Sequence, residues 1–483
     1  MLTVNLYFDE GNLCQCRVFP VAKVGGLADV VGSLPKYLKK IGVETSVVIP
    51  AYDMPWFEGK LYKIVHQGSF YLGPEHLYFE VRYFIDDVLG FPFYTIHIPS
   101  KFDRYGVYAG KNGNYFGDEI ERNIAFQRAF LTWLRDGKVD FDIVHCHDHH
   151  TGLIPFMMKY AYEFSSLSAM PTVFTIHNER YQGAFSWKNK HLLPQFDEWK
   201  SGLLEWASTI NPLASAVRCS YKVTTVSPNY MNELMHDAAG LEQLFRSEWM
   251  KCTGILNGID NEVWDPATDP MIEHLLKEDV VEFKAENKKV ICSLSGLNPD
   301  LPLFGFIGRL VLEKGAEFIA GLIDTWLSQN KNVNFIVLGT GDKSIESALE
   351  TVAKRHPNHV ACMLAYNEAM SHKIYAGADF LLMPSRVEPC GLNQMFAMRY
   401  GTLPIVRSTG GLKDSVKDIS EPGGIGFRFD QMNFDQMMHA IWRAQDMYWH
   451  KDFLHNCVKQ AMSLNYSWDA SAQKYKDIYE AVI

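Results

Sequence analysis

The sequence lacks the features of a membrane protein or a secreted one. No stretch approaches the roughly 18 consecutive apolar residues of a membrane-spanning helix, and the first residues lack the basic region and apolar core of a secretion signal. Nine cysteines are scattered without the spacing of a metal site or of a disulfide framework. Scattered thiols in odd number are typical of a reducing compartment. These absences predict a cytoplasmic protein without a membrane partner.

Basic charge is also scarce. The formal net charge is −10, whereas a nucleic-acid surface needs a basic face, so we expect no nucleic-acid partner. No Gly-x-Gly-x-x-Gly follows a predicted strand, which disfavours an NAD-dependent oxidoreductase. The composition, 47% hydrophobic and 21% charged, is that of an ordinary globular protein. At 483 residues the length favours two or three domains.

Short β-rich runs alternate with helical patterns in both halves of the chain, which is typical of parallel α/β architecture. The expected strands are 45–49, 94–98, 143–146, 173–176 and 223–226 in the first half, and 303–307, 335–338, 380–383 and 403–406 in the second. A polar stretch at 264–289 separates the two sets. The predicted fold is α/β, with two doubly wound Rossmann-like domains that face a cleft, where ligands meet the carboxyl ends of strands.

The first candidate site is a glycine-rich segment near the start of the chain. Lys23, Gly25 and Gly26 stand just before a run with apolar residues at helical spacing. Paired glycines at a helix start let backbone N–H groups approach a phosphate, and the helix dipole assists. An ordinary glycine turn before a helix is the alternative, and Lys23 favours the phosphate interpretation.

The second candidate is a basic loop after the expected strand 303–307. Arg309 follows that strand, and Lys314 comes five positions later. Two cations on one strand-to-helix loop can clamp a diphosphate, with the guanidinium bidentate and the ammonium acting as a point charge. A solvated basic loop is the alternative.

The third candidate is the segment 385–394, directly after the expected strand 380–383. Glu388 can accept hydrogen bonds from sugar hydroxyls, and Gly391 is expected to begin a helix whose first amides suit an anion. Cys390 resembles a nucleophile, but no histidine or asparagine partner is indicated, so a small packed thiol is the preferred interpretation.

The fourth candidate is the histidine-rich segment 145–150, with His177 ending a later strand. Alternation along a strand puts His145 and His147 on the same face. No spacing here matches a usual zinc site, so we expect no metal. Asp148 and His177 lie at the carboxyl ends of neighbouring expected strands, where catalytic groups belong. Each of the two is also compatible with a structural loop role.

Together these segments resemble bacterial and plant glycogen/starch synthases in order and in spacing, from about Pro20 to Tyr479. Any single motif is weak evidence for this resemblance, whereas the ordered set is strong evidence for it. Further matches are 181–183 after His177, 224–228, 256–260, 409–412 and 466–468.

The resemblance implies a GT-B type glycosyltransferase, retaining and independent of metal and cofactor. Such an enzyme moves glucose from ADP-glucose to the non-reducing end of an α-1,4-glucan, so those two molecules are the expected partners. By analogy, residues 1–265 form an acceptor-side domain and 290–460 a nucleotide-sugar domain. The last segment, 461–483, is expected to pack as a helix on the first domain.

Site residues are carried over by position. Lys23, Gly26, Arg309 and Lys314 would hold the diphosphate, and Glu388 with the amides of Gly391 and Leu392 would hold glucose and the distal phosphate. His177 and Asn257 would line the reacting sugar, Tyr366 the adenine side, and Asp148 the region near the acceptor. The catalytic set is then Arg309, Lys314, Glu388, His177 and Asp148, and the donor-binding set is Lys23, Gly25, Gly26, Asn257, Tyr366, Gly391, Leu392 and Thr409.

The chain departs from the family pattern most clearly at its start. Relatives have an apolar strand ending in Ser-Ala-Glu, where this chain has Gln15-Cys16-Arg17. One choice of codons for Cys14 to Phe19, read one base later, gives Ala-Ser-Ala-Glu-Cys-Phe, so we hypothesise a shifted reading frame over 1–19. Smaller departures are the segment 211–216, which lacks the family's lysine, and Asn393 in place of a threonine.

Two alternatives to an ADP-glucose synthase remain from the sequence. One is a retaining glucosyltransferase of the same architecture that uses UDP-glucose, because donor choice rests on contacts that motifs do not resolve. The other is a non-catalytic protein that binds nucleotide sugar or glucan and is disabled by its altered start. Lys23, Arg309, Lys314 and Glu388 favour retained chemistry, since glucan binding alone needs no diphosphate clamp.

Overall fold

The structure is a computed structural model. It describes residues 2–5, 12–14, 21, 26–85, 89–107, 116–137, 141–330 and 332–483, with backbone alone for the first two segments. The chain divides into two compact units. Unit 1 comprises Met1–Gly258 and Trp468–Ile483, and unit 2 comprises Ile259–Ser467.

Unit 2 is built on a six-stranded sheet in the order β15-β14-β13-β16-β17-β18, in which every neighbouring pair is parallel. This is the strand order of a dinucleotide-binding Rossmann sheet, and its switch point lies between β13 and β16. The strands are β13 (Leu303–Ile307), β14 (Asn334–Leu338), β15 (Val360–Met363), β16 (Phe380–Met383), β17 (Leu403–Arg407) and β18 (Phe427–Phe429).

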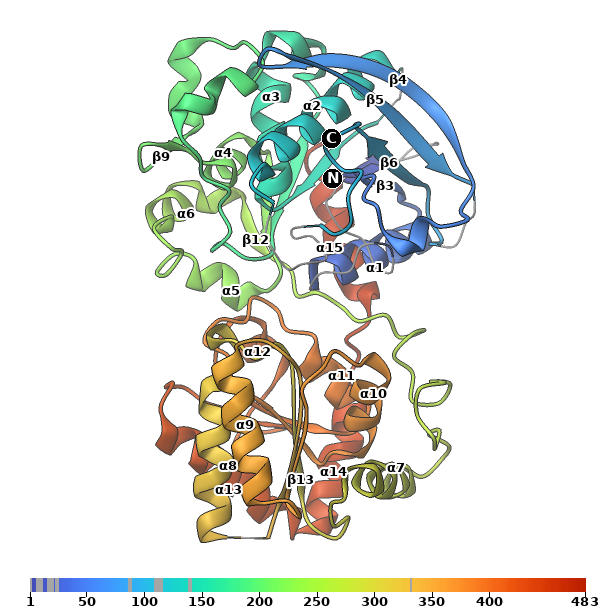
Figure 1. The fold of residues 1–483 in the computed structure, drawn as a ribbon, viewed down its shortest axis with the longest axis vertical. Helices are drawn as coiled ribbons and strands as arrows, with labels where there is room; N and C mark the ends of the chain where they lie inside the picture. Colours follow the sequence, from blue (N-terminus) through green and yellow to red (C-terminus); the bar gives the residue numbers. More distant parts are fainter. Residues whose placement is uncertain are drawn as a thin grey trace. The chain divides into compact units, whose positions relative to one another are not determined.

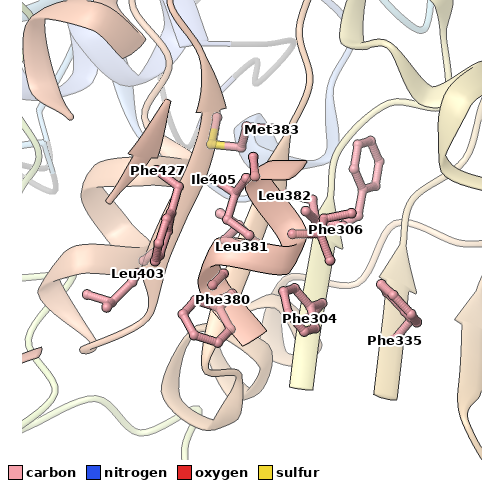
Figure 2. Packing of buried hydrophobic residues seen from close by; sticks show 14 of the residues in the cluster. Phe304, Phe306, Phe335, Phe380, Leu381, Leu382, Met383, Leu403, Ile405 and Phe427 are labelled. Carbon is pink, nitrogen blue, oxygen red and sulfur yellow. The ribbon is translucent and has the colours of Figure 1, made fainter. Parts of the chain in front are cut away.

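Aromatic rings cross the middle of this sheet on one face (Figure 2). Phe304 of β13 lies between Phe335 of β14 and Phe380 of β16, with ring centroids 5.5 and 5.0 Å away. Phe427 of β18 meets Phe380 edge-on at 5.9 Å. Strands buried on both faces tolerate continuous apolar runs, which is why the sequence predicts the central strands of unit 2 so closely.

Helices cover both faces of the unit 2 sheet. Figure 1 shows α8, α9 and α13 on one side of it and α10, α11 and α14 on the other. The helices are α7 (Val280–Ser295), α8 (Ile319–Gln329), α9 (Lys343–Arg355), α10 (Glu368–Gly377), α11 (Asn393–Arg399), α12 (Gly410–Ser415), α13 (Phe434–Tyr448) and α14 (Lys451–Ser463).

Unit 1 contains a ten-stranded mixed sheet in the order β12-β11-β8-β7-β2-β1-β3-β6-β5-β4. Its parallel strands include β3 (Glu44–Pro50), β6 (Phe93–His97), β7 (Val144–His147), β8 (Thr172–Ile176), β11 (Lys222–Thr225) and β12 (Cys252–Gly254). The helices of the unit are α1 (Gly26–Lys40), α2 (Glu119–Asp136), α3 (Ile154–Tyr160), α4 (Pro212–Cys219), α5 (Pro228–Glu233), α6 (Glu242–Glu248) and α15 (Trp468–Glu480). Both units are therefore α/β and Rossmann-like, as predicted.

The sheet of unit 1 is extended by a long antiparallel hairpin that the sequence did not predict. Its strands are β4 (Tyr62–Leu72) and β5 (Glu75–Phe84), joined at Gly73. β4 forms the edge of the sheet, and several of its apolar side chains are exposed. Apolar residues on both faces of an edge strand blur the two-residue alternation that marks a half-buried strand, which explains the omission.

Two strand segments are described at the start of the chain. β2 (Asn12–Cys14) pairs in parallel with β7, while β1 (Leu2–Asn5) pairs antiparallel with β3. The polar sequence upstream of Lys23 predicts a shortened or distorted strand here, because a strand buried on both faces needs apolar residues. Residues 6–11, 15–20 and 22–25 lie outside the described residues, so this stays a prediction.

The units divide earlier than the polar stretch at 264–289 indicates. Gly258 belongs to unit 1 and Ile259 to unit 2. Trp264 is fixed within unit 2, because its ring stacks between His372 and Phe396 at centroid distances of 4.0 and 3.7 Å. The chain returns to unit 1 at Trp468, and α15 packs there against α1.

Among the described helices, none combines the length and the apolar character that crossing a membrane requires.

Candidate functional site

Three loops of unit 2 meet at the carboxyl ends of β13, β16 and β17. The first follows β13 and carries Arg309 and Lys314, the second follows β16 and carries Glu388, and the third contains Thr409. The backbone N–H of Arg386 donates to the carbonyl of Glu313 at 2.8 Å, and that of Gly411 donates to the carbonyl of Glu388 at 3.1 Å. Ligands of doubly wound sheets bind at this position, beside the switch point.

Lys314 and Glu388 form an ion pair at the centre of these loops. The Lys314 Nζ lies 2.7 Å from both carboxylate oxygens of Glu388, and the hydroxyl of Ser385 donates to one of them at 2.9 Å. The Glu388 side chain is 8% exposed and that of Lys314 is 23% exposed. An ammonium has three N–H donors, so one of them lacks a partner among the described residues. The pair is thus held rigidly and retains donor capacity for a ligand.

Two glycines allow the three loops to approach so closely. Gly315 has φ +65°, and a Cβ there would lie 2.0 Å from the carbonyl oxygen of Pro384. Gly410 has φ +44°, and a Cβ there would lie 2.0 Å from the carbonyl oxygen of Glu388. A side chain at either position would push one loop away from the other, because backbone cannot move aside as a side-chain tip can.

Arg309 is more open than Lys314. Its guanidinium is 60% exposed and makes one long contact with Glu313 at 3.5 Å. Such a contact at an exposed position contributes little, so the fork of N–H donors remains available to a planar or tetrahedral anion. The structure therefore places a partly buried and an exposed cation on the same loop, and the sequence predicted the two cations there without their exposure.

The helix after Glu388 begins later than the sequence predicted. Gly391 does not begin it but adopts φ +69°, and α11 starts at Asn393 with Leu392 as its N-cap. The left-handed conformation of Gly391 turns the chain before the helix. The amides of Gly391 and Leu392 have no acceptor in the described part of the chain. They are the backbone donors that the loop presents.

Two amide side chains, of which Gln394 is fully buried, hold this loop in place. Gln394 donates to the carbonyls of Cys390 and Gly391 at 3.2 and 2.9 Å. Asn393, which departs from the family's threonine, donates to the carbonyl of Ile307 at 2.8 Å and so ties α11 to the end of β13. The Cys390 thiol is buried.

Two further predicted residues of unit 2 differ in exposure. Thr409 is 4% exposed and is the N-cap residue of α12. Tyr366 is 74% exposed, and its hydroxyl donates to Glu368 at 3.2 Å. Thr409 is therefore part of the packed loop cluster, whereas Tyr366 presents a ring face to solvent on the loop between β15 and α10.

In unit 1, Asp148 and His177 lie side by side at the ends of β7 and β8. The Asp148 carboxylate accepts the backbone N–H of His177 at 2.8 Å, and the Asp148 N–H donates to the carbonyl of Thr175 at 3.0 Å. Asp148 has φ +52°, a conformation that costs a non-glycine residue of order 1–3 kcal/mol. These two hydrogen bonds hold the residue in that conformation, so the sequence correctly placed the pair together.

His145 and His147 form a buried, stacked pair beneath these residues. Their rings lie 4.3 Å apart, which agrees with the prediction that they share one face of the strand. His145 is within hydrogen-bond distance of the hydroxyls of Tyr479 and Thr175, at 2.9 and 2.6 Å. Burial lowers the pKa of both imidazoles well below the usual value. The pair is therefore neutral in the folded protein near neutral pH.

The remaining predicted residues of unit 1 fall in two groups. Asn257 is 4% exposed, and its side-chain carbonyl has no partner among the described residues. Gly26 is the first residue of α1, with open space around the position of a Cβ. Lys23 and Gly25 lie outside the described residues.

Glu119, His149 and His150 offer one ligand atom each within 4.8 Å of one another. The rings of the two histidines pack at a centroid distance of 3.8 Å, and His149 lies 3.4 Å from the Glu119 carboxylate. The sequence disfavoured a metal on spacing alone, and Glu119, which lies on α2, contributed nothing to that reasoning. The expectation that no metal takes part stays a prediction.

Sequence reasoning also missed the residues that hold the site from behind. The hydroxyl of Ser385, the amide of Gln394 and the link from His147 to His177 (3.0 Å between Nδ1 and Nε2) appear only in the structure. Ser385 stands only three residues before Glu388, so a hydrogen bond between the two side chains could have been predicted from the sequence. The other two depend on tertiary contacts.

Comparison with known proteins is consistent across sequence and structure. Residues 16–247 match the family model described as the starch synthase catalytic domain, and residues 289–461 match that of glycosyl transferases group 1. The glycogen synthase of Flavobacterium johnsoniae is 44% identical over 471 residues, which cover 97% of this chain and 98% of the relative. The glycogen synthase of Finegoldia magna is 37% identical over 97% of this chain and 99% of its own.

A solved structure gives the same result. The catalytic domain of starch synthase IV from Arabidopsis thaliana, bound to ADP and acarbose, matches with a TM-score of 0.85 and 32% identity over 98% of each chain. The fold is that of the GT-B type. This chain belongs to the glycogen/starch synthase family and is a hexosyltransferase.

Proposed function

We propose that the chain transfers glucose from ADP-glucose to the non-reducing end of an α-1,4-glucan with retention of configuration. The observation that carries this proposal is the Lys314–Glu388 pair beside Arg309, at the ligand-binding end of the unit 2 sheet. The near-complete match to glycogen synthases supports it. The choice of donor rests on the Arabidopsis relative, which binds ADP.

In the proposed reaction, the bond between the anomeric carbon and the diphosphate oxygen breaks. The 4-hydroxyl oxygen of the terminal glucose bonds to that carbon on the same face, and its proton leaves to the departing diphosphate. Negative charge grows on the leaving group, and preorganised cations stabilise such charge. Arg309 and the unused N–H of Lys314 are assigned this role. Asp148 is not assigned a nucleophilic role.

The other residues of unit 2 are assigned to recognition of the donor. Glu388 accepts hydrogen bonds from glucose hydroxyls, and the amides of Gly391 and Leu392 donate to glucose and the distal phosphate. Thr409 lies in the same loop cluster. The exposed ring of Tyr366 suits stacking on adenine.

In unit 1, His177 and Asn257 are assigned to the reacting sugar and Asp148 to the acceptor. The unpartnered carbonyl of Asn257 is a buried acceptor that a sugar hydroxyl would satisfy. Lys23, Gly25 and Gly26 are assigned to the diphosphate by resemblance to the family. We expect no metal or cofactor to be needed.

The test is incubation of the purified protein with glycogen and either ADP-glucose or UDP-glucose, with release of nucleoside diphosphate as the readout. We expect release from ADP-glucose that depends on glycogen. Faster release from UDP-glucose would show that UDP-glucose is the donor, and the proposed transfer reaction would stand. Binding of both substrates without release would support the non-catalytic alternative.

A further inference from the structure

We propose that His147 is a positioning residue that fixes the proton of His177 on Nδ1. The proposal deepens the function proposed above, because it concerns a residue assigned to the reacting sugar. Its starting point is a single contact, in which the His147 Nδ1 lies 3.0 Å from the His177 Nε2. Two imidazole nitrogens form a hydrogen bond only when one of them carries the proton.

The surroundings of His147 decide which nitrogen carries it. His147 is fully buried at the end of β7. Its Nε2 has no hydrogen-bond partner among the residues that the structure describes. Either tautomer leaves that atom without a partner, and an orphaned buried N–H is rarer in folded proteins than an orphaned acceptor. The proton of the neutral ring therefore resides on Nδ1, and this N–H donates to His177.

The consequence for His177 follows directly. Its Nε2 must accept, so a neutral His177 carries its own proton on Nδ1. The hydrogen bond made by one ring nitrogen selects the state of the other, as it does for histidines that bind metals or act in catalysis. The nitrogen that carries the proton sets which side of the ring can donate to a ligand.

His177 is also held through its backbone, so the fixation has two points. The Asp148 carboxylate accepts the His177 N–H at 2.8 Å. His147 and Asp148 are adjacent on the chain. His147 contacts the ring of His177, and Asp148 accepts a hydrogen bond from its backbone N–H. The His147 ring in turn stacks on His145, which Tyr479 and Thr175 hold at 2.9 and 2.6 Å.

The proton position can be measured without any reaction. Protein labelled with ¹⁵N-histidine gives distinct ring-nitrogen signals for protonated and bare nitrogens, and the His177→Asn variant identifies the His177 signals by their loss. We expect a protonated Nδ1 and a bare Nε2 at His177. A bare Nδ1 would overturn the proposal. This measurement stands even if the protein transfers no glucose, so its failure is distinct from failure of the proposed function.

Kinetics test the role in turnover. His147→Leu fills the space without donating, and we expect kcat to fall about 10- to 100-fold, as for other residues that orient a functional histidine, with little change in KM. His147→Asn places an amide N–H near the former Nδ1 and should recover most of the loss. Cys146→Ala is the matched control, since Cys146 is buried on the same strand and faces away.

Three kinetic outcomes contradict the proposal. They are wild-type turnover in His147→Leu, an asparagine variant as slow as the leucine variant while equally folded, and an equal fall in kcat for Cys146→Ala. If His147→Leu does not fold, the asparagine variant and the nitrogen signals of the unmodified protein still decide the question.

Discussion

The two units present different chemistry at the ends of their parallel strands. In unit 2, Arg309, Lys314 and Glu388 bring formal charges together, and the loops that carry them pack backbone against backbone. In unit 1, His177 contacts the buried, neutral imidazole of His147 and the carboxylate of Asp148, and neither group is a cation. The difference matches the proposed reaction, in which the leaving group gains negative charge and the sugar hydroxyls do not.

Removing a charge from unit 2 should have the largest effect on turnover. In Lys314→Ala, we expect kcat to fall about 10²–10³-fold, because losing one preorganised electrostatic contact typically costs that much. The KM for glycogen should change little. Lys343→Ala is the control, since Lys343 is a highly exposed lysine of the same unit that pairs with Glu346. Turnover in Lys314→Ala equal to wild type would mean that the loop is a solvated basic turn.

The second prediction concerns the acid stability of the two units. Burial lowers the pKa of His145 and His147 in the folded state well below 6.5. Below pH 6.5 the unfolded chain therefore binds protons that the folded chain does not, and unit 1 loses stability as pH falls. Each such histidine contributes about 1.4 kcal/mol per pH unit.

Unit 2 contains a carboxylate, Asp418, whose charged form is favoured in the folded state, whereas folding favours the neutral form of the two histidines. Although burial of Asp418 opposes its ionisation, hydrogen bonds from Arg443 and from backbone amides lower its pKa below the usual 3.8. Its contribution is present above that pH and is lost only as pH falls further. Burial also lowers the pKa of Lys284 in unit 2 to about 7, so unit 2 loses some stability over the same range. Hydrogen exchange at pH 7.5 and 5.5 should therefore show a larger loss of protection in β7 and β8 than in β13 and β14. Equal loss in both units would contradict this prediction.

Restoring the start of the chain should bring unit 1 closer to its relatives. We expect Gln15→Ser, Cys16→Ala and Arg17→Glu, with an apolar strand upstream, to raise stability by about 1 kcal/mol and to lower the KM for the donor a few-fold. The physical reason is that the polar residues at 15–17 do not suit a central parallel strand, which is buried on both faces. Thermal unfolding and initial rates measure the two effects.

The same change made in Lys314→Ala serves as its control. Both sites are assigned to the diphosphate although they lie in different units, so the departure of the combined effect on the rate from the product of the two single effects measures their coupling. Absence of any gain in stability or in activity would remove the physical support for a shifted reading frame, and the gene sequence would settle the hypothesis itself.

The smallest expected effect is that of chelation. Transfer should persist in EDTA, because the charge stabilisation is assigned to Arg309 and Lys314. His149→Gln is the matching variant, since it removes one member of the Glu119–His149–His150 group. A strict requirement for a divalent ion, lost together with His149, would move that group into the mechanism.

The sequence predicted unit 2 better than unit 1 for a physical reason. Strands such as β13 and β16 are buried on both faces, so their apolar runs have sharp ends, and the loops that follow them carry Arg309 and Glu388. The β4–β5 hairpin is set by tertiary pairing, which local patterns do not encode. The start of α11 was misplaced because Gly391 serves the turn before the helix and not its first residue.

The candidate site shows the same limit. Residue types and spacing predicted Arg309 with Lys314 on one loop, Glu388 on another, and Asp148 beside His177, and the resemblance to the family joined them into one set. Which groups touch depends on loops that are far apart in the sequence. The bidentate geometry of Lys314 on Glu388 and the contact from His147 to His177 could be obtained only from the structure.

The central claim is that this chain lengthens an α-1,4-glucan with glucose from ADP-glucose. The most direct measurement is mass spectrometry of a short maltooligosaccharide after incubation with the protein and ADP-glucose, followed by digestion with an enzyme specific for α-1,4 linkages. We expect a ladder of products, each one glucose longer than the last, that the digestion removes completely. An unchanged oligosaccharide, or free glucose released in its place, would contradict it.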